Sequence, residues 1–134
     1  MKRRELREHI FELVFRVEFN GPDEMPEQLR LFFEGLEALE EKDQLYMEEK
    51  YARIMDKLPE IDARIGETAQ GWKLSRLAKV DLAILRLAVY EMKYDEDVPV
   101  GVAINEAVEL SKKFGGDESP AFINGILGKL GKEA

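Results

Sequence analysis

Apolar residues recur at spacings of three and four through most of the chain, a pattern that predicts helices from end to end. Glycine and proline clusters separate these segments, while strand signals are nearly absent. We expect helices over residues 3–19, 26–40, 43–57, 59–69, 75–93, 99–114 and 120–130. The predicted fold class is therefore all-α, with about seven helices in two small helical bundles.

The length of 134 residues is typical of one domain. We expect a single domain over residues 1–134. Its N-terminal helical bundle would cover about residues 1–70 and its C-terminal helical bundle about residues 72–131.

The last three predicted helices carry clear start and stop signals. Ser75 is a reasonable N-cap for the fifth helix, and Gly115 and Gly116 stop the sixth. Ser119 followed by Pro120 is typical of a helix start, with proline at the first helical position.

The first predicted helix has two apolar stripes. One consists of Leu6, Ile10, Leu13, Val14 and Val17, and the other of Phe11, Phe15 and Phe19. At about 100° per residue the stripes together cover on the order of 240° of the helix surface. The favoured interpretation is a central helix inside the bundle, and the alternative is that part of the phenylalanine stripe forms a subunit interface.

Composition places the chain among soluble globular proteins. Hydrophobic residues make up 45% of the chain and charged residues 36%, and there are no cysteines. The missing cysteines exclude disulfides, thiolate zinc sites and a cysteine nucleophile, and favour a reducing cytoplasm. Glu8 and Glu12 interrupt the apolar run that a signal peptide needs, and no stretch is long enough to span a membrane. We expect a cytoplasmic protein without membrane contact.

Charge is unevenly distributed. The net charge is −8, but residues 2–7 carry a net charge of +3, whereas residues 34–49 carry seven acidic and one basic side chain. The acidic balance argues against a protein that coats nucleic acid through bulk electrostatics. A basic tip on an acidic body can still bind phosphates.

The arginines of this tip share one side of the first helix. Arg3, Arg4 and Arg7 are three and four residues apart, and guanidinium groups bind phosphate oxygens in pairs. Cations at a helix N-terminus oppose the macrodipole, so they do not serve helix stability. Two interpretations remain open: an RNA-phosphate contact, or a solvated helix end whose arginines pair with Glu8 and other neighbours.

Catalytic parts are missing. His9, the only histidine, shares an arc with Glu5 and Glu12, and we interpret the three as a solvated salt cluster rather than a metal site. The chain has neither a GxxxxGK phosphate loop nor a GxSxG elbow. We expect no enzymatic activity, no cofactor and no metal.

Four further residues attract attention. Trp72 is more typical of a core plug than of a base-stacking platform, and Phe122 is either core or a stacking platform. Asn105 and Asn124 stand inside apolar helices, where we expect each to be buried and to bond a neighbouring backbone.

Three consecutive blocks resemble the NusB transcription antitermination family: WKLSRLAKVDLAILRLAVYEM, DVPVGVAINEAVELSKKFG and SPAFINGILGKL, which span residues 72–130. The opening RRELREHIFELVFRVEF is similar to that family's arginine-rich first helix. The resemblance implies a non-enzymatic helical protein that binds the boxA element of ribosomal RNA leader transcripts. It also implies a heterodimer with NusE, a small-subunit ribosomal protein, within an RNA polymerase antitermination complex.

The resemblance also implies site residues. The arginine-rich tip matches Lys2, Arg3, Arg4 and Arg7, and the family's further RNA contacts fall near Asp81 and on Asp117, Ser119 and Phe122. Some family members self-associate through the RNA-binding face, which the phenylalanine-rich first helix would suit. The alternative function is a protein-binding helical scaffold or homodimer with little RNA affinity.

Overall fold

The computed structural model describes residues 1–69 and 73–132, which contain seven α-helices, one short 3-10 helix and no strand. The elements are α1 (Arg3–Arg16), α2 (Met25–Glu34), α3 (Glu41–Asp56), α4 (Leu58–Thr68), η1 (Leu74–Arg76), α5 (Lys79–Tyr94), α6 (Val100–Phe114) and α7 (Ser119–Lys132). The all-α prediction with about seven helices is confirmed.

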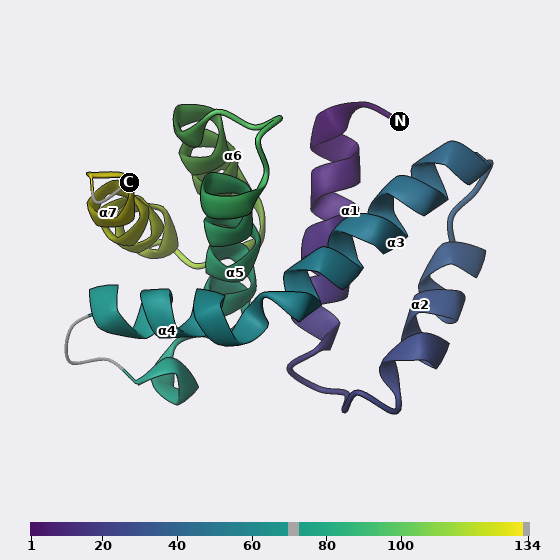
Figure 1. Ribbon diagram of the computed structural model, residues 1–134, viewed down its shortest axis with the longest axis horizontal. Helices are drawn as coiled ribbons and strands as arrows, with labels where there is room; N and C mark the ends of the chain where they lie inside the picture. Colours follow the sequence, from purple (N-terminus) through teal and green to yellow (C-terminus); the bar gives the residue numbers. More distant parts are fainter. Residues whose placement is uncertain (70–72, 133–134) are drawn as a thin grey trace.

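The helices form two groups that meet along α1 and α5 (Figure 1). α2 and α3 pack on α1, whereas α4, α6 and α7 pack on α5. The boundary between the bundles near residue 70 stays a prediction. That boundary assigned α4 to the N-terminal bundle, whereas α4 packs mainly on α5 and α7. Trp72 lies outside the described residues.

α5, rather than α1, is the helix buried on all sides. Every residue from Asp81 to Glu91 is buried, and all of them are apolar except the charged Asp81, Arg86 and Glu91. α1 buries one broad face instead. Its phenylalanine stripe runs outward, since Phe11 is buried, Phe15 is half-buried and Phe19 is 58% exposed.

Three helix boundaries differ from the predictions by three residues or more. α1 ends at Arg16, because residues 17–19 form turns whose amide groups donate to carbonyls three residues back. α2 ends at Glu34, and Ala38 in the following loop has a φ of 52°, the left-handed conformation that ends helices. Ser75 does not cap α5, because Leu77 and Ala78 have extended backbones and separate it from the helix.

The two asparagines are exposed, so the prediction that they are buried is wrong. Asn105 is two residues from Ala103 and from Ala107, which form the buried face of α6. Two helical steps of about 100° place it on the opposite side of the helix. Asn124 is exposed on α7 in the same way, next to the buried Ile123. The helical spacing from the buried alanines, rather than the apolar neighbours, is the signal that identifies the exposed face for Asn105.

Buried ion pairs join α5 to both groups of helices. Near its C-terminal end, Glu91 binds Arg7 of α1 and Lys50 of α3. Nearer its N-terminal end, Arg86 donates to Asp62 of α4 at 2.9 and 3.0 Å and also binds Glu18, just after α1. These charges are paired in the interior, where removing one partner would leave the other uncompensated.

Candidate nucleic-acid interface

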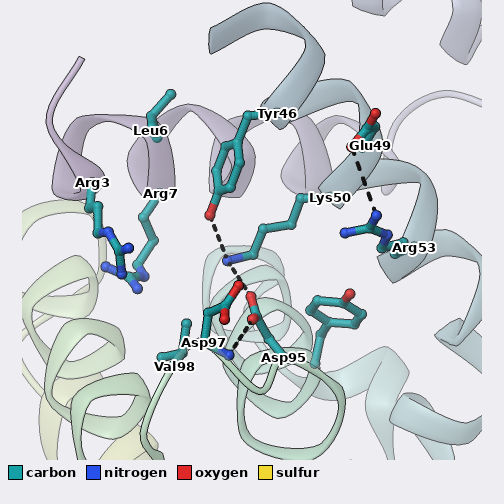
Figure 2. Close-up of a pocket in the computed structure, with 11 residues that line it drawn as sticks. Arg3, Leu6, Arg7, Tyr46, Glu49, Lys50, Arg53, Asp95, Asp97 and Val98 are labelled. Atoms are coloured by element: carbon teal, nitrogen blue, oxygen red, sulfur yellow. Dashed lines mark hydrogen bonds and ion pairs between the residues drawn. The ribbon is translucent and has the colours of Figure 1, made fainter. Parts of the chain in front are cut away.

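The basic tip at the start of α1 is only partly free to bind phosphates. Lys2, Arg3 and Arg4 are exposed, and Arg3 lines a small cavity of about 170 Å³ between α1, α3 and the end of α5 (Figure 2). Arg4 donates from Nε and Nη2 to the carboxylate of Glu106 on α6, at 3.1 and 3.0 Å. Arg4 is therefore exposed yet paired, and Lys2 and Arg3 are the accessible cations of this tip.

Arg7 belongs to the interior. Its side chain is 9% exposed, and its Nε and Nη2 donate to Oε1 and Oε2 of Glu91, each at 3.0 Å. Lys50 donates to the same carboxylate at 2.8 Å and lies 3.2 Å from Oδ2 of Asp95, beside the cavity drawn in Figure 2. Two cations and two carboxylates thus form a neutral network. The sequence pattern grouped Arg7 with Arg3 and Arg4. Its ion-pair partner, Glu91, is 84 residues away and could not be recognised from the residues around Arg7.

The network also sets the protonation of its members. Burial disfavours the charged forms of Lys50 and Arg7, but the Glu91 carboxylate outweighs this effect. The pKa of each is therefore raised above its ordinary value. Both side chains therefore remain cationic at physiological pH, so the ion pairs that join α1 and α3 to α5 are maintained.

A second surface brings together the other predicted site residues. An open cavity of about 630 Å³ lies between the start of α5 and the start of α7. Its lining includes all four residues that the resemblance assigned outside the tip: Asp81, Asp117, Ser119 and Phe122. Residues that are up to 41 positions apart in the sequence therefore border one cavity.

Backbone geometry at the start of α7 shapes this cavity. Ser119 is buried, and its Oγ accepts a hydrogen bond from the amide of Gly116 at 3.1 Å. Gly115 allows the turn to close, because a Cβ there would lie 2.7 Å from the Ser119 side chain. Any larger residue at Gly115 would force the turn apart and move the helix start.

Asp81 and Phe122 give the cavity its chemical character. Asp81 is in the first turn of α5, and its buried Oδ1 accepts no hydrogen bond from the described residues. A buried carboxylate oxygen of this kind is uncommon in a protein interior, and Asp81 is one of the residues that line the cavity. Phe122 is half-buried: it packs against the core and also lines the cavity. Its role as a base-stacking platform stays a prediction.

Two basic residues that we did not predict lie near the start of α5. Arg76 is exposed and lines the cavity between α5 and α7, whereas Lys79 lines a separate small cavity with Glu18. The Lys79 ammonium lies 5.4 Å from the centre of the exposed Phe19 ring. Lys79 also lies 3.6 Å from the Glu18 carboxylate. The spacing of Lys73, Arg76 and Lys79, three residues apart, was the signal that could have identified them.

The tip and the cavity lie toward opposite ends of α5. Arg7 binds Glu91, and Asp81 precedes Glu91 by ten residues, about 15 Å along the helix. Contacts of α1 bridge this distance: Lys113 donates to the Glu8 carboxylate at 2.8 Å, and the Phe114 ring lies 5.0 Å from Phe11. A strip along α1 and α6 therefore connects the two surfaces.

The predicted cluster of His9 with Glu5 and Glu12 is present, but the His9 side chain itself is largely shielded from solvent. Its ring meets the Phe32 ring edge-on at 5.5 Å, and its side chain is 17% exposed. The carboxylates of Glu5 and Glu12 lie at 4.0 and 3.8 Å, too distant for hydrogen bonds. Within residues 1–69 and 73–132, no group of three potential ligands could hold a metal ion. Nor is any described helix long and apolar enough to cross a membrane.

Comparison with known proteins supports the resemblance over the whole chain. The model of the NusB family matches residues 4–132. The Transcription antitermination protein NusB of Lachnoclostridium phytofermentans is 50% identical over 130 residues, which cover 97% of this chain and 98% of that protein. The protein of the same name from Acetivibrio thermocellus is 47% identical over 132 residues, covering 98% and 90%.

Solved structures agree. T. maritima NusB is 34% identical and superimposes with a TM-score of 0.87 over 99% of this chain and 92% of that chain. A structure of antitermination factors NusB and NusE with double-stranded RNA matches with a TM-score of 0.86 over 98% and 97%, and at 23% identity it shows the fold alone. The two-bundle architecture expected from the sequence is confirmed, and the chain belongs to the NusB family.

Proposed function

We propose that the protein is a non-enzymatic transcription antitermination factor that binds boxA RNA of ribosomal RNA leader transcripts together with NusE. It would act within an RNA polymerase antitermination complex, and therefore in the cytoplasm. Relatives that are half identical over nearly the whole chain carry the name of such a factor. The observation that carries the RNA-binding part is the cavity between α5 and α7, where four predicted site residues converge.

The cavity has the chemistry for reading a single-stranded base. The partly exposed ring of Phe122 offers a stacking surface, and the Asp81 carboxylate accepts hydrogen bonds from the N–H groups of a base edge. Arg76 beside the cavity and the exposed Lys2 and Arg3 of the tip supply cations for the phosphates on either side. Bases would thus be read at the cavity, while the cations position the RNA backbone.

The test is a titration of labelled boxA RNA and a scrambled RNA of the same composition, each with and without NusE, at two salt concentrations. The expected result is binding that prefers boxA, strengthens with NusE and weakens as salt rises. Equal affinity for both RNAs, with NusE present, would refute a boxA-specific factor.

A second candidate function is a protein-binding scaffold or homodimer with little RNA affinity. The observation that favours it is the exposed Phe19 ring, 5.1 Å from Phe15 and continuous with the phenylalanine stripe of α1. A dimer through this stripe would cover the strip between the tip and the cavity. Sedimentation velocity over a range of concentrations, with and without boxA RNA, distinguishes the two, because RNA would dissociate a dimer formed through its own binding face.

A further inference from the structure

A groove on the other side of α1 from the cavity between α5 and α7 has no role in the proposed function. It lies between α2 and α3, with a volume of about 680 Å³. Its apolar lining consists of Pro26, Leu29, Phe33, Leu36 and Leu39, and its polar lining of Arg30, Glu34, Gln44 and Glu48. In Figure 1, α2 stands on the side of α1 away from α6 and α7, and α3 crosses α1.

The groove exists because both helices pack on α1 more closely than on each other. The loop between α2 and α3 crosses one end, and its Leu36 and Leu39 are only half-buried. Leu29 is also half-buried, on the face of α2 that borders the groove. Several leucines thus keep apolar surface in contact with water, at a site concave enough to receive side chains.

The charge around this groove is concentrated to an unusual degree. Residues 21–49 contain ten acidic and two basic side chains, a net charge of −8, which equals that of the whole chain. The net charge of the remaining residues is therefore zero. Both basic side chains are already paired with carboxylates, Arg30 with Glu27 and Glu34, and Lys42 with Glu40. The field at the groove is that of an acidic surface around an apolar floor.

This combination selects among possible partners. An RNA or an anionic lipid surface would be repelled, and a second copy bound groove to groove would bring two acidic surfaces together. An amphipathic helix with a basic polar face satisfies both features, because its apolar side chains fill the groove while its lysines or arginines meet the acidic rim. We propose that the groove between α2 and α3 binds a basic amphipathic helical segment of a protein partner.

The position of the groove has a consequence for assembly. The groove borders α2 and α3, whereas the RNA-binding cavity borders α5 and α7 on the other side of α1 (Figure 1). The protein can therefore hold RNA and the basic segment at the same time. The acidic surface would also keep RNA away from the groove, so the two ligands would not compete.

The experiment uses the full chain and a fluorescein-labelled peptide of about 14 residues, with leucines spaced three and four apart and lysines elsewhere. One control peptide has the same composition with its leucines redistributed around the helix, and a second has glutamate in place of lysine. Fluorescence anisotropy measures affinity. We expect the amphipathic basic peptide to bind at least about tenfold more tightly than either control.

Variants distinguish the groove from bulk attraction. Glu34→Lys/Glu48→Lys reverses two charges in the groove lining, and Glu60→Lys/Glu96→Lys reverses two exposed charges elsewhere with the same change in net charge. The groove variant is expected to lose about tenfold in peptide affinity, and the control less than about twofold. Circular dichroism melting checks that both variants fold. Equal losses in the two variants would overturn the proposal.

The apolar floor is tested separately with Leu39→Ser, a half-buried loop residue, which should weaken the peptide without altering boxA binding. In NMR titrations of the wild-type protein, amide shifts should change over residues 26–48 and not over residues 116–122. Shifts confined to residues 116–122 would contradict the proposal. Concentration-dependent self-association that the peptide reverses would assign the groove to a second copy and overturn it as well.

Discussion

The basic tip of α1 and the cavity between α5 and α7 were both predicted as RNA contacts, yet their side chains are in opposite states. At the tip, Arg7 is buried against Glu91, and Arg4 is held by Glu106. At the cavity, one buried oxygen of Asp81 has no hydrogen-bond partner among the described residues, and Phe122 is only half-buried. The tip therefore carries positive charge that is largely paired within the protein, whereas the cavity has a polar group and an aromatic ring that a ligand could contact.

The comparison teaches that the sign of a charge cluster does not determine its role. Each arginine of the tip could bind either a phosphate or a carboxylate of its own chain, and the fold supplies carboxylates to two of them. Arg7 joins α1 to α5, which makes it structural, whereas Lys2 and Arg3 remain available. Within these six positions, some substitutions should therefore lower RNA affinity and others should lower the stability of the fold.

The largest expected effect is on stability. Arg7→Ala leaves the Glu91 carboxylate, which is 1% exposed, with Lys50 as its one remaining partner among the described residues. Breaking a buried ion pair typically costs about 3 kcal/mol or more, so urea unfolding should show a loss of that order. At urea concentrations where the variant is still folded, any change in affinity should be the same for boxA RNA as for scrambled RNA.

Arg3→Ala is the matched control, because Arg3 is exposed at the same end of the same helix. Its urea midpoint should equal that of the wild type. A comparison in which Arg7→Ala is as stable as Arg3→Ala, but binds RNA much more weakly, would show that Arg7 is a phosphate contact after all.

The next effect is on selectivity. Phe122→Ala removes the proposed stacking surface, and base stacking on an aromatic ring contributes about 1–3 kcal/mol. We expect at least about a fivefold loss of boxA affinity and a smaller loss for the scrambled RNA, so the preference narrows. Anisotropy titrations of both RNAs measure it.

Tyr94→Ala removes a different exposed aromatic ring, which is 40% exposed at the C-terminal end of α5. It should leave the preference for boxA unchanged. Equal losses for both RNAs in Phe122→Ala would eliminate the stacking role and leave Phe122 as a core residue.

A smaller effect concerns the pairing of Arg4. Glu106→Gln removes the carboxylate that holds its guanidinium and so releases a cation at the tip. The slope of log affinity against log salt should become steeper by about 0.7, the value for one more phosphate contact on a single strand, and equally for both RNAs. An unchanged slope would place Arg4 outside the RNA path.

Sequence patterns were sufficient for the fold because each helix carries its own signals. Proline at the start of α7 and the glycines before it identified the first residue of that helix to within one position. Errors arose where a local signal was absent or misleading. Ser75 is a good capping residue, but the chain continues through η1 and an extended segment before α5 begins.

The candidate site could be predicted only in part, because pairing across the fold has no local signature. Resemblance named Asp81 and Phe122, and the fold brings them to one cavity. Nothing in the sequence near Arg7 identifies Glu91, 84 residues away, as its partner. Arg76 belongs to three basic residues spread over positions 73–79, a weaker signal than the four basic residues within positions 2–7.

The smallest expected effect is a loss of stability at alkaline pH, at the tip end of the molecule. Burial opposes the charge of Lys50, but Glu91 and Asp95 raise its pKa above the ordinary 10.5, and burial raises the pKa of Tyr51 above 10.0. Each group binds its proton more tightly in the folded state, so its contribution is present below the unfolded pKa and is lost as pH rises through the folded value. The free energy of unfolding should be flat from about pH 7 to 9 and fall above about pH 10, by up to about 1.4 kcal/mol per pH unit for each group. Lys50→Arg keeps a cation that does not titrate in this range and should make the decline shallower in urea titrations at each pH, whereas an unchanged slope would mean that Lys50 does not stabilise the fold through its charge.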